Sequence, residues 1–314
     1  MRERASRTRS APYPARQDDA HWRIMSSVAQ LSSTPVAKPL DVQWIHGSPS
    51  SKHNTDPDLQ TYWYDENTVI LRQNKAIDYE APFLFLLFGQ QRAVLLDTGA
   101  TAAPDLFPLR RVVDGLIETW LGRNPRNGYG LLVLHTHAHG DHVAGDEQFA
   151  DRADTVLVEA DKDAAWKFFG FSGDADDIRT VDLGGRVLQA FATPGHHAAA
   201  VTFYDPWTGI LLTGDTVYRG RLYIVDWAAY SHSIDRLIEF SAAHPVTHVI
   251  GCHIEMTRQP GVDYPVRTTY QPDEPPLEMT VAHLHKIRVA LDEVGPQPAL
   301  RAFDEFILWP DDDE

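Results

Sequence analysis

The chain has 314 residues, 43% of them hydrophobic and 10% aromatic, which is enough for a sizeable core in one large domain or two small ones. Its formal net charge of −16 disfavours a nucleic-acid partner, because such binding uses Lys and Arg to neutralise phosphates. The single cysteine, Cys252, excludes an intramolecular disulfide. No apolar run is long enough to span a membrane. We therefore expect a cytoplasmic protein with no membrane or nucleic-acid partner.

The first 38 residues differ in composition from the rest of the chain. They are polar, rich in Arg and Ser, and carry scattered prolines. We expect residues 1–38 to form a disordered N-terminal tail and residues 39–314 to form one domain. The tail also resembles an organelle transit peptide, and an extension that precedes a natural start at Met25 is the alternative.

Short apolar segments alternate with amphipathic ones along the domain, which indicates an α/β fold. Continuous apolar runs such as FLFLLF are typical of strands buried on both faces. Apolar residues from Leu109 to Trp120 recur at the spacing of one helical face. The expected strands are 68–73, 83–89, 93–99, 130–135, 155–160, 186–192 and 247–252, with a hairpin over 200–215, and the expected helices are 109–120, 232–244 and 284–294.

The segment LHTHAHGDH, residues 134–142, places four possible metal ligands directly after an expected strand. Imidazole and carboxylate are usual ligands of zinc. Residues two apart in an extended segment point the same way, so His137 and His139 can face one metal ion while Asp141 and His142 face a second. Only 15 of the 314 residues are histidines, so three within six positions beside an aspartate indicate a metal site rather than a surface loop.

Three further candidate ligands also follow expected strands. His196 stands in the sequence TPGHH, Asp215 in LLTGD and His253 in VIGCH. Ligands often gather at the strand ends along one edge of an α/β sheet. A lone His or Asp after a strand is usually an ordinary loop residue. Together with the cluster at 137–142, however, these residues make seven ligands, the number that two adjacent zinc ions need when one carboxylate bridges them.

The order of these motifs resembles that of the metallo-β-lactamase superfamily. The resemblance covers about residues 68–256 and includes the upstream Asp97-Thr98-Gly99. It implies a four-layer αββα sandwich with the site at one end of two sheets. It also implies that Asp97 orients the ligand loop and that a metal-bound hydroxide is the nucleophile. The implied ligands are His137, His139 and His196 for the first metal, Asp141, His142 and His253 for the second, and Asp215 as the bridge.

Two positions narrow the branches of the superfamily. His139 stands where the diiron oxygen reductases have Glu, and Asp215 counts against the antibiotic-hydrolysing branches. The resemblance thus implies a lactonase- or esterase-like dinuclear hydrolase that cleaves an ester, lactone, thioester or amide bond of a small molecule. The sequence leaves open whether the chain forms a homodimer. Two zinc ions are expected, with iron or manganese as alternatives. The alternative functions are a glyoxalase II-like thioesterase and a mononuclear iron oxidoreductase of the persulfide dioxygenase type.

Three residues are candidates for direct roles in catalysis: Asp141, Asp215 and Tyr218. Asp141 can donate a proton to the leaving group. Tyr218 follows Asp215 by three positions, as in the acyl-homoserine lactonase branch, where a Tyr contacts the substrate; an ordinary loop tyrosine is the alternative. We expect residues 216–231 to be irregular and their aromatic side chains, at 218, 223, 227 and 230, to line the substrate pocket.

Overall fold

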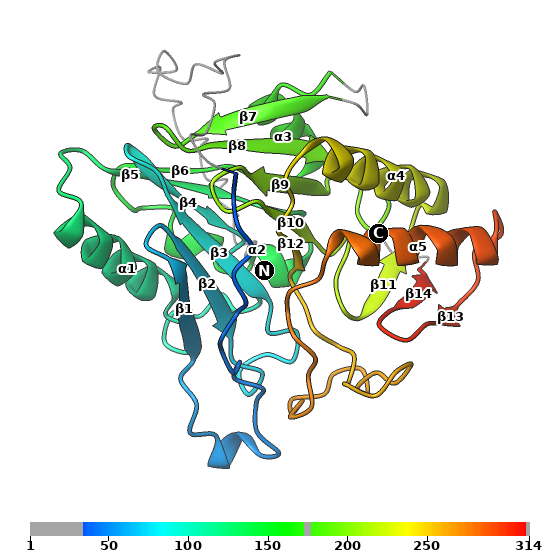
Figure 1. Ribbon diagram of the computed structural model, residues 1–314. Coiled ribbons are helices and arrows are strands. Elements are labelled where there is room, and N and C mark those ends of the chain that lie inside the picture. Colours follow the sequence, from blue (N-terminus) through cyan, green and yellow to red (C-terminus); the bar gives the residue numbers. More distant parts are fainter. Residues whose placement is uncertain (1–33, 173–176, 312–314) are drawn as a thin grey trace, which may run out of the picture.

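Two facing β-sheets with helices on their outer sides make up most of the protein (Figure 1). The computed structural model describes residues 34–172 and 177–311. The first sheet contains, in spatial order, β1 (Leu59–Asp65), β2 (Thr68–Gln73), β3 (Phe83–Phe88), β4 (Arg92–Leu96), β5 (Gly130–Leu134) and β6 (Thr155–Leu157). The second contains β12 (His248–Gly251), β10 (Ile210–Gly214), β9 (Val201–Asp205), β8 (Val187–Ala192) and β7 (Ile178–Asp182).

A third, smaller sheet and five helices complete the fold. The small sheet consists of β11 (Arg221–Ile224), β14 (Ile307–Pro310) and β13 (Arg301–Ala302), with β11 and β14 parallel. The helices are α1 (Leu109–Arg123), α2 (Gly140–Val143), α3 (Lys162–Phe169), α4 (Trp227–Ala243) and α5 (Val281–Val294), and short 3-10 turns occur at Ser51–His53 and Asp146–Gln148.

The central strands of the first sheet divide their side chains between two cores, because successive strand residues point to opposite faces. On β3, Phe83, Phe85 and Leu87 pack between the two sheets. Leu84 and Leu86 point the other way and join the core that includes the apolar face of α1. The unbroken apolar run of this strand therefore reflects burial on both faces, as expected from the sequence.

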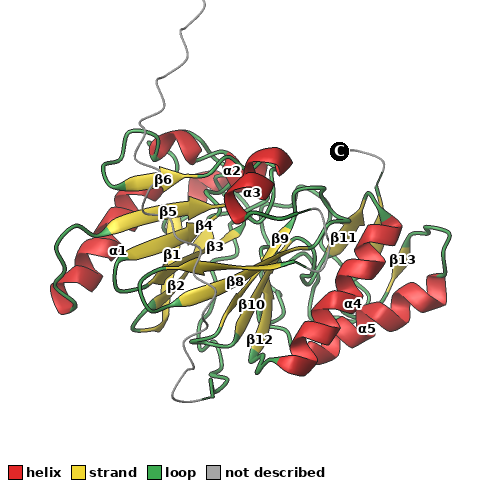
Figure 2. Cartoon of the chain, turned by 90° about the horizontal axis from the view of Figure 1, so that it is seen from above, coloured by secondary structure: helices red, strands yellow, loops and turns green. Residues whose placement is uncertain are grey.

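The second sheet is built in the same way. Leu212 and Ile250 pack between the sheets, whereas Leu211 and Val249 face a third core that contains side chains of α4 and α5. Figures 1 and 2 show α1 on one side of the paired sheets and α4 and α5 on the other. The order of layers is therefore helix, sheet, sheet, helix, which confirms the four-layer αββα sandwich.

The segment 216–231 is more regular than expected from the sequence. It contains β11 and the first turn of α4, which begins at Trp227. Asp226 is the N-cap of this helix, and its side chain accepts a hydrogen bond from the Ala229 backbone N–H at 2.9 Å. The expectation of an irregular segment was wrong, because β11 pairs with β14, a strand more than 80 residues further along the chain.

The expected N-terminal tail falls largely on residues 1–33, which lie outside the described residues. Its last part, residues 34–38, runs close to the domain: the carbonyl oxygen of Lys38 lies 2.7 Å from Nε2 of His248. In the described ranges, no helix is both long enough and apolar enough to cross a membrane.

Candidate metal centre

The candidate ligands come from strand ends of both sheets. The first sheet contributes His137 and His139 from the loop after β5, and Asp141 and His142 from α2, which follows that loop directly. The second sheet contributes the residues that follow β8, β10 and β12, which are His196, Asp215 and His253. All seven lie at the same edge of the sandwich, and they form two neighbouring groups.

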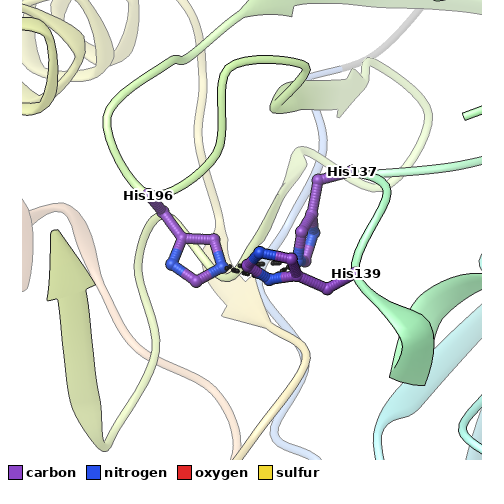
Figure 3. A group of neighbouring side chains, drawn as sticks. All are labelled: His137, His139 and His196. Carbon is purple, nitrogen blue, oxygen red and sulfur yellow. Dashed lines mark hydrogen bonds between the residues drawn. The ribbon is translucent and has the colours of Figure 1, made fainter. Parts of the chain in front are cut away.

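Three imidazole rings make up the first group (Figure 3). Nε2 of His137 lies 3.0 Å from Nδ1 of His139 and 3.3 Å from Nε2 of His196. The last pair of atoms, His139 Nδ1 and His196 Nε2, is 3.1 Å apart. A tetrahedral zinc ion with Zn–N bonds of about 2.0–2.1 Å separates its ligands by about 3.3 Å. The three nitrogens therefore have the spacing of three corners of such a site.

Two carboxylates and two imidazoles make up the second group. Oδ2 of Asp141 lies 3.2 Å from Nε2 of His142 and 3.2 Å from Nε2 of His253. Oδ2 of Asp215 lies 3.3 Å from Nε2 of His253 and 3.9 Å from Nε2 of His196 in the first group. The Asp215 carboxylate thus stands between the two groups.

Two buried atoms of the second group show that a cation fits there. Within the described residues, Nε2 of His142 and Oδ1 of Asp215 are buried and have no partner in hydrogen-bond geometry, although Asp141 Oδ2 lies 3.2 Å from the nitrogen. Buried polar atoms in folded proteins are nearly always partnered by protein, water or an ion. A nitrogen and a carboxylate oxygen that converge without a partner are a donor set typical of zinc. The residues present therefore fit a pair of metal ions.

The two groups differ in the protonation of their side chains. Burial lowers the pKa values of His137, His139 and His196, so these rings are neutral, as metal ligands must be. Burial by itself would raise the pKa values of Asp141 and Asp215, but the adjacent imidazoles outweigh it and hold both well below the usual range. Burial by itself would lower the pKa values of His142 and His253, but the two carboxylates outweigh it and hold both well above the usual range. The first group therefore offers neutral nitrogens, whereas the second pairs two carboxylates with two imidazoles that would release protons on binding a metal ion.

The ring nitrogens that point away from the two groups are held by neighbouring oxygens. Nδ1 of His196 lies 2.9 Å from the Tyr223 carbonyl, and Nδ1 of His253 lies 3.1 Å from the Glu80 carbonyl. Nδ1 of His137 lies 3.2 Å from Oγ1 of Thr136. Such contacts fix the orientation of each imidazole and raise its basicity as a ligand.

Asp97 holds the ligand loop in the role implied by the resemblance. Its Oδ1 accepts a hydrogen bond from the Thr136 backbone N–H at 2.7 Å, and its Oδ2 lies 2.9 Å from Nδ1 of His142. The Cys252 thiol donates to the same Oδ2. Burial raises the pKa of this thiol, so Cys252 is a neutral buried residue.

Tyr218 lines the pocket beside the ligands, but its hydroxyl is engaged elsewhere. The side chain is 2% exposed, and the hydroxyl donates to the Arg221 carbonyl oxygen. Its role in catalysis stays a prediction. Of the other aromatic residues expected at the pocket, Tyr223 lines it. Tyr230, on α4, is instead fully buried in the core between this helix and the second sheet, and Trp227 packs against that core.

The pocket at the candidate ligands has a volume of about 200 Å³. Besides ligands and tyrosines, it is lined by three carboxylates that the sequence did not single out, Glu80, Glu255 and Asp311. Glu80 precedes β3, Glu255 follows β12 and Asp311 follows β14. No local motif marks them, because only the fold brings these three segments together.

Comparisons with known proteins agree with this geometry. A sequence profile described as the metallo-beta-lactamase superfamily matches residues 81–245, just over half of the chain. Hydroxyacylglutathione hydrolase from Chelativorans sp. (strain BNC1) is 29% identical over 164 residues, a match that spans 51% of this chain and 60% of that protein. Acyl-coenzyme A thioesterase MBLAC2 from Bos taurus is 28% identical over 204 residues, covering 54% of this chain and 72% of that protein.

The solved structures show the same fold. A crystal structure of the DIM-1 metallo-beta-lactamase exposed to ceftazidime matches with a TM-score of 0.50 at 15% sequence identity, covering 77% of this chain and 100% of that one. Layer order, site position and sequence profile lead to one conclusion: the chain belongs to the metallo-beta-lactamase superfamily of metal-dependent hydrolases.

Proposed function

We propose that the chain is a dinuclear zinc hydrolase that cleaves a small-molecule thioester, with esters and lactones as related substrates. The observation that carries the proposal is the position of Asp215, which stands between three neutral imidazoles and a second group containing Asp141. A single-metal oxidoreductase needs only one such group. The relatives favour a thioester, because their names describe a hydroxyacylglutathione hydrolase and an acyl-coenzyme A thioesterase.

Zinc ions bound here would lower the pKa of water and polarise the carbonyl group of the substrate. The residues of the chain have separate tasks. His137 and His196 are oriented by burial and by the contacts to their outer nitrogens, and Asp215 is buried between the two groups. Asp141 borders the pocket, with 18% of its side chain exposed. We assign it the transfer of the proton that water loses when its oxygen attacks the carbonyl carbon; that proton ends on the departing sulfur or oxygen.

The test is a substrate screen of the purified chain combined with metal quantification. Thioesters, lactones, aryl esters and phosphodiesters are compared after loading with zinc. About two zinc ions per chain and preferred turnover of thioesters are expected. One iron per chain, together with oxygen uptake on a persulfide substrate, would instead establish the oxidoreductase.

Changing Asp215→Asn tests the two-metal arrangement. The amide keeps the shape of the side chain but removes the charge that stands between the groups, so we expect zinc content to fall from about two towards one. Hydrolysis should fall by more than about 100-fold, the upper range for losing a residue that only supports a ligand. Asp226→Asn, at the N-cap of α4, is the matched control. Full turnover by the Asp215 variant would refute the two-metal mechanism.

A further inference from the structure

A second cavity of about 140 Å³ adjoins the pocket at the metal centre. The two share three lining residues, Glu80, Tyr223 and Glu255. The rest of the cavity wall comes from the segment after β2, which includes Lys75, from Arg221 at the start of β11, and from the segment 265–271 between β12 and α5. A substrate at the metal centre could therefore extend one end into this cavity.

The cavity contains a buried lysine without an ion-pair partner. Lys75 is 3% exposed, and its Nζ donates one hydrogen bond, to the Tyr79 carbonyl oxygen at 2.9 Å. No carboxylate of the described residues lies within ion-pair distance of this nitrogen. Burial, together with the positive charge of Arg72, lowers the pKa of Lys75 to about 8. The side chain is thus mainly protonated at neutral pH, with N–H groups left to donate.

Two other groups on the cavity wall are also incompletely bonded. The Tyr223 hydroxyl accepts a hydrogen bond from Nε of Arg221 at 2.9 Å, because a guanidinium can only donate. Its own O–H finds no acceptor in the part of the chain that the structure describes. Oε1 of Gln271, a residue 3% exposed, is buried and has no hydrogen-bond partner. The half-buried Tyr223 hydroxyl is a donor available to a ligand, whereas the buried Gln271 Oε1 is an acceptor and takes a donor such as water.

The charges are distributed unevenly between the two hollows. Lys75 and Arg267 line the cavity and not the metal pocket, whereas the ligand carboxylates Asp141 and Asp215 line the metal pocket only. Of the shared acids, Glu255 is paired with Arg221, its Oε1 lying 2.6 Å from the guanidinium. Among the described residues, those that line the cavity but not the metal pocket therefore include cations and no carboxylate.

We propose that this cavity binds a carboxylate at the end of the substrate, with Lys75 as the main donor and Arg267 as the second. The proposal rests on the proposed hydrolase function and narrows it to thioesters whose acyl or leaving group carries a free carboxylate. A carboxylate supplies acceptor oxygens for the Lys75 ammonium and the Tyr223 hydroxyl. Hydrogen bonds to an ionised carboxylate are shorter and stronger than those between neutral groups. An uncharged group of the same size leaves Lys75 without an ion-pair partner.

The test compares matched substrates. Arylthiol monothioesters of succinate, glutarate and adipate are set against the same compounds with the free carboxylate blocked as a methyl ester. For the acid of best-fitting length, we expect kcat/KM to exceed that of its methyl ester by about 10- to 100-fold, as for a hydrogen bond to a charged group. Equal kcat/KM values for all pairs would overturn the proposal.

Two variants identify the residues responsible. Lys75→Met should bring the ratio between the free acid and its methyl ester close to one, and Arg267→Gln should lower it severalfold. Lys162→Met, at an exposed lysine on α3 that lines neither hollow, is the matched control and should keep the ratio. The ratio is the readout because a general loss of stability affects both substrates alike. A Lys75→Met enzyme that keeps the ratio would contradict the assignment.

A measurement of ligand binding distinguishes failure of the cavity assignment from failure of the proposed hydrolase function. Calorimetry with free glutarate and the zinc-loaded protein should show binding that Lys75→Met weakens at least about tenfold. If no thioester is hydrolysed but this difference persists, the hydrolase function fails and the cavity assignment stands. If thioesters are hydrolysed and the two proteins bind glutarate equally, only the cavity assignment fails.

Discussion

A single buried carboxylate, that of Asp97, holds the ligand loop of the metal centre in place. Asp97 is fully buried and adopts a left-handed backbone conformation, with φ at 65°. That conformation costs free energy in a residue other than glycine. It turns the carboxylate toward Thr136 and His142, so the cost is offset by the hydrogen bonds that hold the ligand loop.

We expect Asp97→Asn to weaken metal binding without removing a ligand. Oδ2 of Asp97 faces Nδ1 of His142, and an amide at this position lacks the negative charge that stabilises the ring in its ligating orientation. Loss of such a partner typically lowers metal affinity by about 10- to 100-fold. Competition with a chromogenic chelator measures the change. Asp146→Asn, at a partly exposed carboxylate paired with His135, serves as the control. Equal affinities in all three proteins would contradict the role of Asp97.

The elements differ in how far the sequence predicts them. The buried strands β2, β3 and β5 begin where the sequence indicated. In β3 and β5 the signal is a continuous apolar run, which burial on both faces produces, whereas β2 is buried throughout but contains Arg72 and Gln73. β11 and β14 were not predicted. Each has four residues. β11 pairs with the distant β14, and β14 also pairs with the two-residue β13, so neither strand carries a strong local signal.

The same distinction applies to the site. The cluster from His137 to His142 was predicted because its residues lie together in the sequence. Lys75 and Gln271 stand almost 200 residues apart in ordinary surroundings, and only the fold brings them to one cavity. Tyr218 was singled out for its spacing from Asp215, but spacing could not reveal that its hydroxyl donates to a backbone carbonyl.

At the scale of one loop, we expect Gly195→Ala to disturb the first metal group. Gly195 precedes His196 and has φ at 136°, and a Cβ there would overlap the Tyr230 backbone in α4. Its carbonyl also accepts the N–H groups of Val225 and Asp226. The overlap should cost about 1–3 kcal/mol of stability, seen as a lower melting temperature, and should reduce zinc content.

The control for this variant is Gly122→Ala. Gly122 lies in α1, and a Cβ there meets no atom within 4 Å. Alanine should stabilise this exposed helical position by about 0.5–1 kcal/mol. If both alanine variants melt alike and keep their zinc, then close packing at Gly195 does not position His196.

For the whole molecule, the end of the sandwich opposite the metal centre is closed by a buried ion pair. Arg186, before β8, pairs with Asp205 at the end of β9 in the second sheet, with the Nη2–Oδ2 distance at 2.6 Å. The same guanidinium donates to the carbonyls of Asn67, in the turn between β1 and β2, and of Phe88, at the end of β3 in the first sheet. One fully buried side chain thus joins the two sheets.

Arg186→Ala should destabilise the protein by about 3–5 kcal/mol, because it leaves the Asp205 carboxylate buried without its partner. Burial by itself raises the pKa of Asp205, and Arg186 outweighs it and lowers that pKa below 3.8. The ion pair therefore stabilises the fold at pH values above the pKa of Asp205. The difference in unfolding free energy between the wild type and the Arg186→Ala variant should narrow as the pH falls through that pKa. Denaturant unfolding at several pH values measures it.

Arg258→Ala, at an ion pair whose side chains are 62% and 60% exposed, should cost less than about 1 kcal/mol. A similar loss in both variants would argue against the buried pair as the joint between the sheets.

The division of the seven proposed ligands between the two sheets has a consequence for biosynthesis. Each metal group draws ligands from both, so neither half of the chain holds a complete site before the sheets dock. His253 is the last of these ligands to leave the ribosome. High-affinity zinc uptake would then occur only after the two halves have met, so that a retained metal pair marks a correctly completed fold.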